Sequence, residues 1–197
     1  MVVDEGHIYS GSRDGTIRVW NKKTLKEVAV LMGHSREVVT VMVDEGYIYS
    51  GSKDRTLRIW NKKTYSEVIG IKKYITFEDV VKESYPSFNS IEVDGEYMYC
   101  GLGDSTVRVY DKRGFRELGV LEGHLGSVRS VKIDEMRVYT GSVDGTIRIW
   151  EKGVFNEIEV LGGSAGEVKI IEVDDSCILG AHQMESYGYG IKVNSRY

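Results

Sequence analysis

The sequence has no long apolar run and no block of like charge. A membrane-spanning helix needs ~18 consecutive apolar residues, and no stretch of this chain approaches that length. The N-terminal residues Met1–Glu5 hold neither a basic region nor an apolar run, so we expect no signal peptide. An Asn-x-Ser/Thr glycosylation site is also absent. We therefore expect a chain that has no membrane partner.

Cysteine is scarce, and no excess of basic residues is present. Only Cys100 and Cys177 occur among the 197 residues. Both fall in runs that predict strands, so we expect buried thiols rather than a disulfide framework, and a reducing, cytoplasmic compartment. The formal net charge is −4. Because proteins that bind duplexes usually present a basic face, we expect no nucleic-acid partner.

A segment of 22 residues recurs along the chain with little change. The copies at Val3–Thr24 (VDEGHIYSGSRDGTIRVWNKKT) and Val43–Thr64 (VDEGYIYSGSKDRTLRIWNKKT) are identical at 17 of 22 positions. Two further copies begin at Val93 and Ile133, and a degenerate fifth begins at Val173. The copies follow one another every 40 residues, except that the third follows the second after 50. The chain is therefore a repeat array with one insertion of ten residues.

Each copy contains four short strand signals and no helical periodicity, apart from a hint of one at Phe77–Ser84 in the insertion. An Asp-Gly turn joins the second and third strands in two copies. Arg55 and Ser105 replace that glycine in two others, so we expect that a positive φ is not strictly required there. In the second copy the predicted strands are Val38–Val43, Tyr47–Ser52, Thr56–Trp60 and Ser66–Ile71.

The ~40-residue period, the pairs Gly33-His34 and Gly123-His124, and the SGSxDxTxRxW runs resemble the WD-repeat (WD40) β-propeller family. The resemblance covers nearly the whole chain, although Trp-Asn or Trp-Glu replaces the family's Trp-Asp in most copies. It implies an all-β fold, a β-propeller of four-stranded antiparallel blades, with four recognisable repeats plus a degenerate, incomplete fifth. The predicted blades of this single domain or fragment are approximately 1–31, 38–71, 88–121, 128–161 and 168–194, with an insertion at 72–89.

Histidine, hydroxyl and carboxylate side chains, the parts of a hydrolase triad, recur together in two copies. In the family such a set looks like the hydrogen-bonded tetrad that ties the loop before a blade to its second and third strands. An active site occurs once, whereas a structural device recurs. We therefore expect two structural tetrads and no catalytic residue, metal site or cofactor. The tetrads are His34, Ser50, Asp54 and Trp60 in the second copy, and His124, Thr140, Asp144 and Trp150 in the fourth.

The other three copies lack parts of this set, which predicts that stability is concentrated in the second and fourth. The first copy has no histidine, the third has neither histidine nor tryptophan, and the fifth is the most degenerate. The residues at the corresponding positions are Ser10, Asp14 and Trp20 in the first copy, Cys100, Asp104 and Tyr110 in the third, and Gly163, Ser164 and Asn194 in the fifth.

Four arginines are each followed nine residues later by a glutamate. This spacing predicts an ion pair between the third and fourth strands of each blade. The pairs are Arg18 and Glu27, Arg58 and Glu67, Arg108 and Glu117, and Arg148 and Glu157.

The predicted strands do not close a ring, because the first copy begins within an inner strand and the fifth ends without an outer one. Seven blades would need ~280 residues. Three interpretations stay open: a fragment of a longer propeller, two chains that complete each other, and a five-bladed ring. Unpaired strand edges at open propeller ends predict self-association.

The insertion at 72–89 carries a group of aromatic and apolar residues. Such residues on a loop are typical of protein-binding sites, so they are candidate partner contacts. The alternative is that they pack over the third blade, which lacks its tetrad. The residues are Tyr74, Ile75, Phe77, Tyr85 and Phe88.

The resemblance implies a non-catalytic scaffold for protein–protein interaction, with a partner that the sequence does not identify. One alternative is a propeller that binds a small ligand or catalyses a reaction in its central channel. Lys132, Lys169 and Glu172 on the predicted inner strands are the candidates for that role. Another alternative is an array of repeats that serves assembly alone.

Overall fold

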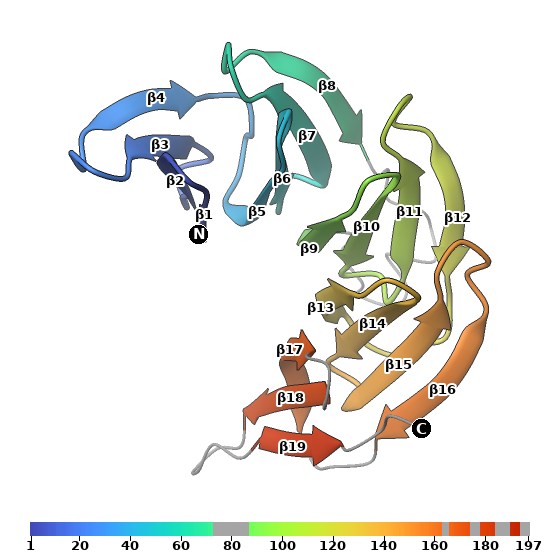
Figure 1. Cartoon of the computed structure of the whole chain (residues 1–197). Coiled ribbons are helices and arrows are strands. Elements are labelled where there is room, and N and C mark those ends of the chain that lie inside the picture. Colours follow the sequence, from blue (N-terminus) through green and yellow to red (C-terminus); the bar gives the residue numbers. More distant parts are fainter. Residues whose placement is uncertain (73–86, 163–165, 174–177, 184–189, 194–197) are drawn as a thin grey trace. The chain divides into compact units, whose positions relative to one another are not determined.

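The computed structural model describes residues 1–72, 87–162, 166–173, 178–183 and 190–193. Every regular element in these ranges is a β-strand, which confirms the all-β prediction (Figure 1). Among these residues no helix has the length and apolarity that a membrane crossing requires. The chain divides into two compact units, unit 1 (Met1–Ile91) and unit 2 (Glu92–Tyr197).

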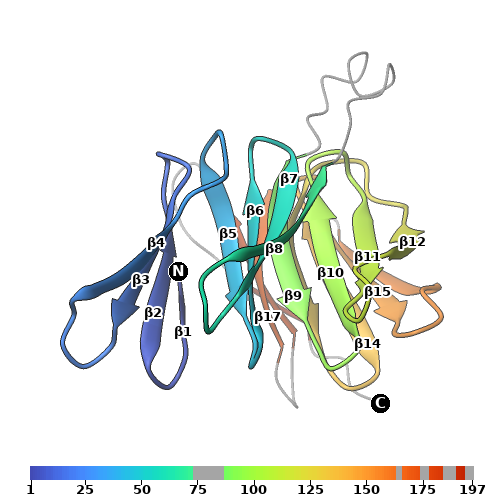
Figure 2. The ribbon, with the colours of Figure 1, turned by 90° about the horizontal axis from the view of Figure 1, so that it is seen from above.

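Unit 1 contains two four-stranded sheets whose strands pair antiparallel in chain order. Each sheet twists, so that the outer strand β4 is turned relative to β1, and β8 relative to β5 (Figure 2). The first sheet is β1 (Val2–Val3), β2 (His7–Gly11), β3 (Ile17–Asn21) and β4 (Glu27–Leu31); the second is β5 (Val38–Val43), β6 (Tyr47–Ser52), β7 (Thr56–Asn61) and β8 (Glu67–Lys72).

Unit 2 contains the third, fourth and fifth sheets, and the division between the units falls inside β9. The fifth sheet has three strands within the described residues, in agreement with a degenerate last repeat. The strands are β9 (Phe88–Val93), β10 (Tyr97–Leu102), β11 (Val107–Asp111) and β12 (Glu117–Leu121); β13 (Val128–Ile133), β14 (Arg137–Ser142), β15 (Thr146–Glu151) and β16 (Glu157–Gly162); and β17 (Glu167–Val173), β18 (Ile178–Gln183) and β19 (Gly190–Val193).

Glycines in the second strand of the first four sheets allow the next inner strand to come close. A Cβ on Gly51 would lie 2.7 Å from the Cβ of Phe88, and one on Gly141 would lie 2.6 Å from Val168 Cγ1. Gly11 and Gly101 make the same approach to Val38 and Val128. The inner-strand residues that meet these glycines are buried, and the apolar core forms where successive sheets meet.

The turn between the second and third strands requires a left-handed residue, contrary to the expectation from the sequence. Gly15 and Gly145 adopt φ values of 84° and 82°, and Arg55 and Ser105 adopt 68° and 71°. The non-glycine residues accept a conformation that costs an L-residue roughly 1–2 kcal/mol. The prediction that a positive φ is not required was therefore wrong: the four described turns share one geometry, and only the residue that adopts it varies.

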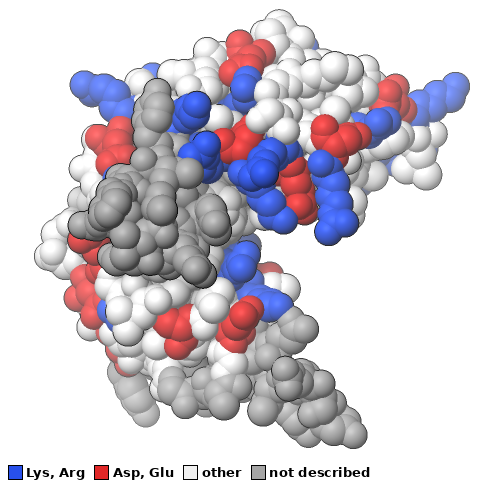
Figure 3. Space-filling model, turned by 180° about the vertical axis from the view of Figure 1, so that it is seen from behind, with Lys and Arg blue, Asp and Glu red and all other residues white. Residues whose placement is uncertain are grey.

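Charged side chains of both signs lie next to one another over the face of the molecule in Figure 3. This mixture agrees with a net charge of −4 spread along the sequence without blocks.

Candidate functional site

The most complete group of polar side chains in unit 1 joins a loop to two strands and their turn. His34 lies in the loop between β4 and β5, Ser50 in β6, Asp54 in the β6–β7 turn and Trp60 in β7. Ser50 pairs with Arg58 in the register of β6 and β7, so Trp60, two residues further along β7, lies diagonally across from Ser50 on the same face. The antiparallel register thus places the hydroxyl beside the indole.

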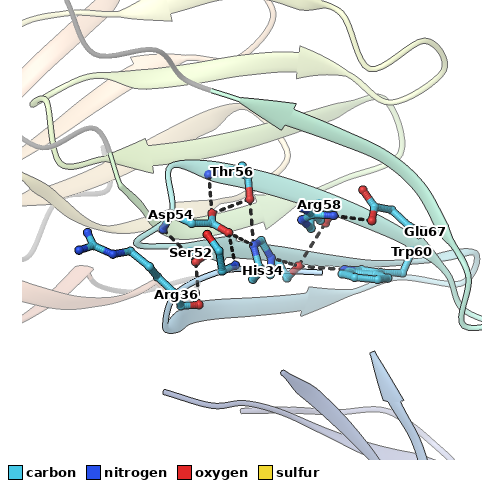
Figure 4. A network of polar contacts seen from close by, with 10 residues as sticks. His34, Arg36, Ser52, Asp54, Thr56, Arg58, Trp60 and Glu67 are labelled. Atoms are coloured by element: carbon cyan, nitrogen blue, oxygen red, sulfur yellow. Dashed lines mark hydrogen bonds and ion pairs between the residues drawn. The ribbon is translucent and has the colours of Figure 1, made fainter. Parts of the chain in front are cut away.

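The imidazole of His34 links Asp54 to Ser50, and Figure 4 shows His34 beside Asp54. Its Nδ1 lies 3.0 Å from Asp54 Oδ2, and its Nε2 lies 2.7 Å from Ser50 Oγ. The indole Nε1 of Trp60 donates to Ser50 Oγ at 2.9 Å. Because a carboxylate can only accept, Nδ1 carries the proton and Nε2 accepts from the Ser50 hydroxyl. The structure therefore brings the four predicted residues into one chain of hydrogen bonds.

Two further residues join this network, and the sequence analysis missed both. Thr56 donates to Asp54 Oδ1 through its hydroxyl at 2.5 Å and its backbone N–H at 2.8 Å. The backbone N–H of Ser35 donates to Asp54 Oδ2 at 2.9 Å. The signal for the threonine was present, because a threonine stands two residues after the aspartate in each of the first four copies. Asp54 is thus the most highly connected member of the network.

Burial sets the charge state of the network. It lowers the pKa of His34 below 6.5, against the attraction of Asp54. It would by itself raise the pKa of Asp54, but hydrogen bonds from Thr56 and Ser35 outweigh burial and lower that pKa. At neutral pH the imidazole is neutral and the carboxylate is charged. The Ser50 side chain is fully buried, with 0% exposed.

The fourth sheet, in unit 2, repeats this geometry. His124 Nδ1 lies 2.9 Å from Asp144 Oδ2, and its Nε2 lies 2.8 Å from Thr140 Oγ1. Trp150 Nε1 donates to Thr140 Oγ1 at 2.9 Å. Burial lowers the pKa of His124. For Asp144, burial is outweighed by hydrogen bonds, first from Thr146, and the pKa falls to about 2.

The first sheet holds only part of the network. Trp20 Nε1 donates to Ser10 Oγ at 3.1 Å, and Asp14 accepts from the hydroxyl of Thr16 at 2.7 Å. The fifth copy's Gly163, Ser164 and Asn194 lie outside the described residues.

The third sheet holds still less of the network. The fully buried thiol of Cys100 occupies the hydroxyl position, and burial raises its pKa. Tyr110 occupies the tryptophan position and is also buried. Asp104 accepts from the hydroxyl of Thr106 at 2.6 Å. Cys177, the second cysteine, lies outside the described residues.

The predicted arginine–glutamate pairs are confirmed in all four sheets. They also explain the glycine before each tetrad histidine, because a Cβ on Gly33 would lie 2.8 Å from the guanidinium of Arg58. The Nη1 atoms of Arg18, Arg58 and Arg108 lie 2.9, 2.5 and 2.8 Å from Glu27, Glu67 and Glu117, and Arg148 pairs in the same way with Glu157.

A second set of ion pairs ties neighbouring sheets of one unit together, and the sequence analysis missed it. In unit 1, Lys62 Nζ lies 2.8 Å from Asp4 Oδ2. In unit 2, Lys152 Nζ lies 2.8 Å from Asp94 Oδ2. The partners are 58 residues apart in both cases. The sequence signal for these pairs was a lysine two residues after each repeat's tryptophan or tyrosine, combined with the aspartate at the second position of each copy.

The three inner-strand candidates for a ligand site are two lysines and a glutamate, and both lysines lie near carboxylates. Lys132 Nζ lies 3.7 Å from Glu92 Oε1, and Lys169 Nζ lies 3.7 Å from Glu167 Oε2. Burial raises the pKa of Glu92; Lys132 opposes this shift, and the charge of Glu172 adds to it. The two cations thus lie beside carboxylates, which leaves little excess positive charge for an anionic ligand.

The predicted partner contacts fall mostly outside the described residues. Tyr74, Ile75, Phe77 and Tyr85 lie there. Phe88 was wrongly assigned to this group, because it is fully buried as the first residue of β9. It occupies the position of Val38, Val128 and Val168, against the glycine of the preceding sheet. Lys72 belongs to β8, so the segment between the strands is 73–87 rather than 72–89.

Comparison with known proteins agrees with this architecture. The family model for the WD40 repeat (WD domain, G-beta repeat) matches residues 3–21, 25–61 and 115–151. No curated protein sequence matches the chain significantly.

Two solved structures are similar to the chain. The computationally designed Ika8 protein has a TM-score of 0.76 and 22% identity, over 92% of this chain and 54% of that one. The structure of U3-55K has a TM-score of 0.78 and 18% identity, over 91% and 55%. The chain therefore spans about half the length of both. The matched segments show that the chain contains WD40 repeats, and the structural similarity, together with the four-stranded sheets, shows the fold of propeller blades.

Proposed function

We propose that this chain is a non-catalytic scaffold for protein–protein interaction. WD40 repeats generally mediate such interactions. The observation that carries the proposal is the duplicated hydrogen-bond network. The groups that resemble a hydrolase triad occur twice with matching geometry, and in both sheets the hydroxyl is fully buried and already bonded to an indole. Side chains used in this way stabilise a blade that can present its loops to a partner.

An activity measurement tests the non-catalytic part of the proposal. We expect that the chain does not hydrolyse ester or peptide substrates, because the hydroxyl of Ser50 is closed to them. Thr140→Ser serves as a control, since it makes the fourth sheet's network match that of the second. Hydrolysis that disappears in Ser50→Ala, while circular dichroism shows an unchanged fold, would contradict the proposal.

The scaffold role is tested by direct binding. A protein captured on the immobilised chain is identified, purified separately and titrated against the purified chain by calorimetry. We expect saturable binding with a fixed stoichiometry, and its loss when the chain is unfolded by urea. If no captured protein binds the purified chain in solution, the scaffold role is wrong.

A further inference from the structure

Three neighbouring loops of unit 1 carry four cations, which we call the basic loop cluster. Arg13 lies in the β2–β3 turn, Arg36 in the loop between β4 and β5, and Lys53 and Arg55 in the β6–β7 turn. No residue of this cluster belongs to the hydrogen-bond network of His34 through its side chain. In Figure 4 the side chain of Arg36 points away from that network.

Backbone contacts hold the three loops together. The N–H of Val38 donates to Ser12 O at 2.9 Å, and that of Lys53 donates to Glu37 O at 3.0 Å. The hydroxyl of Ser52 donates to Arg36 O at 3.1 Å. A Cβ on Gly15 would lie 2.6 Å from the carbonyl oxygen of His34, so the first turn packs directly on the loop. The cations are therefore displayed on a preorganised surface.

The same loops of unit 2 contain no cation. Gly103 and Val143 stand where unit 1 has Arg13 and Lys53, and Gly126 stands where it has Arg36. The position of Arg55 is Ser105 in the third sheet and Gly145 in the fourth. The compared loops of unit 1 hold four cations and three carboxylates, whereas those of unit 2 hold three carboxylates and no cation. The positive charge is thus a property of these loops in unit 1 and not of the repeat.

The carboxylates of unit 1 neutralise the cluster only in part. Asp54 is buried in the hydrogen-bond network, and Asp14 lies 3.8 Å from Arg18, which is outside the cluster. Glu37 is shared, at 2.6 Å from Lys53 Nζ and 3.9 Å from Arg13 Nε. The Arg13 side chain is 90% exposed and that of Lys53 is 53% exposed. Solvent-exposed cations therefore remain for a ligand of opposite charge.

Arg55 adds an observation of a different kind. It adopts a φ of 68°, at a position where two other repeats hold glycine, and a left-handed arginine costs free energy that glycine does not. The same φ occurs at Ser105, so the conformation belongs to the turn, and what differs at Arg55 is the cationic side chain that the turn carries.

We propose that the basic loop cluster binds an acidic, aspartate- or glutamate-rich segment of a partner protein. This inference rests on the proposed scaffold function and names the chemistry of its partner. Arginine forms bidentate hydrogen bonds with carboxylates, which makes three arginines suited to such a segment. A continuous nucleic-acid backbone fits less well, because Glu37 lies between two of the cations and the chain has a net charge of −4.

Fluorescence anisotropy with a labelled glutamate-rich peptide tests the proposal. We expect binding that weakens as salt is added, and a loss of about tenfold in the variant Arg13→Gln/Arg36→Gln/Lys53→Gln. The matched control, Lys23→Gln/Lys26→Gln/Lys63→Gln, removes the same charge from exposed positions of unit 1 outside these loops. We expect this control to bind within about twofold of the unmodified chain.

Equal weakening in the two triple variants, or no binding of the peptide by the unmodified chain, would overturn the proposal. Tighter binding of duplex DNA than of the peptide would also overturn it. Different outcomes would contradict the scaffold function and the acidic-segment inference. If a captured partner binds the cluster variant as tightly as the unmodified chain, the scaffold stands and the acidic-segment inference falls. If no protein binds at all, the scaffold proposal itself is wrong.

Discussion

The third and fourth sheets belong to the same unit and have the same strand order, yet their polar interiors differ. In the fourth, His124, Thr140, Asp144 and Trp150 form a continuous network. In the third, the position of Thr140 is held by Cys100, a buried thiol. The third sheet nevertheless forms its β10–β11 and β11–β12 ladders. A sheet therefore forms without the complete network, because apolar burial and strand pairing are sufficient.

The two sheets also differ in the hydrogen bond between a tyrosine and the aspartate near the start of each repeat. Tyr139 donates its hydroxyl to Asp134 at 2.7 Å, as Tyr9 and Tyr49 do to their aspartates. The hydroxyl of Tyr99 is buried without a hydrogen-bond partner among the described residues, while Asp94 Oδ2 pairs with Lys152. Residues 88–114, which include most of the third sheet, also fall outside the segments matched by the family model. We infer that the third sheet is held mainly by apolar contacts.

The largest expected difference is between Asp144→Ala and Asp104→Ala. Removing Asp144 leaves the imidazole N–H of His124 and the backbone N–H of Leu125 without their acceptor, so we expect a loss of about 3 kcal/mol in the free energy of unfolding. Asp104→Ala should cost about 1 kcal/mol. Chemical denaturation of the two variants measures both losses within one unit. Equal losses would break the contrast between the sheets.

Acid should weaken the fourth sheet more than the third, but less than Asp144→Ala does. The pKa of His124 is lowered by burial, so its contribution is present above the unfolded value of 6.5 and is lost as the pH falls through the folded value. The pKa of Asp144 falls from 3.8 to about 2, so its contribution is lost below pH 3.8. Denaturation at a series of pH values should show both losses of stability. The loss below pH 6.5 should be smaller in His124→Gln. A nuclear magnetic resonance titration that gives His124 a pKa above 6.5 would contradict this account.

A smaller difference is expected between two tyrosines. Tyr139→Phe removes a hydrogen bond to Asp134 and should cost about 1 kcal/mol. Tyr99→Phe removes a buried hydroxyl without a partner in the described structure, so it should be neutral or stabilising. Thermal or urea denaturation of both variants measures the two changes in stability. A larger loss for Tyr99→Phe than for Tyr139→Phe would show that the third sheet's hydroxyl is bonded after all.

The smallest effect concerns a feature that the sheets share. Ser105 in the third sheet and Arg55 in the second adopt the same left-handed conformation. Replacing either by glycine relieves the backbone but increases the entropy of the unfolded chain, which leaves a net gain of about 0.5 kcal/mol. We expect equal gains for Ser105→Gly and Arg55→Gly in denaturation experiments, with Gly145→Ala as a destabilised control. A gain in only one turn would show that the turns are not equivalent.

Much of the fold could be predicted because the sequence repeats. The period fixed the order of strands, and the recurrence of His34 and Asp54 as His124 and Asp144 predicted which side chains meet. The position of Phe88 could also have been found, since it lies 50 residues after Val38 and 40 before Val128. Its aromatic character suggested a binding surface, whereas its place in the repeat gives the correct answer, a core residue.

Other features depend on geometry that a residue type does not reveal. Arginine and serine rarely adopt positive φ, so Arg55 and Ser105 concealed the common turn conformation. The ties between Lys62 and Asp4, and between Lys152 and Asp94, cross from one sheet to its neighbour. Such contacts follow only when the packing of successive sheets is known. The basic loop cluster likewise depends on three segments that the sheets bring together.

The lysine–aspartate ties have a consequence for how the chain can be divided. Each carboxylate is only 16–20% exposed, and its cation is supplied by the following sheet of the same unit. Removing one sheet would therefore leave a mostly buried carboxylate without its counter-ion, which is costly in a low-dielectric environment. The smallest piece that keeps both members of a tie is a pair of consecutive sheets. By this criterion the structural unit of the chain, a pair of sheets, is about twice as long as its sequence repeat.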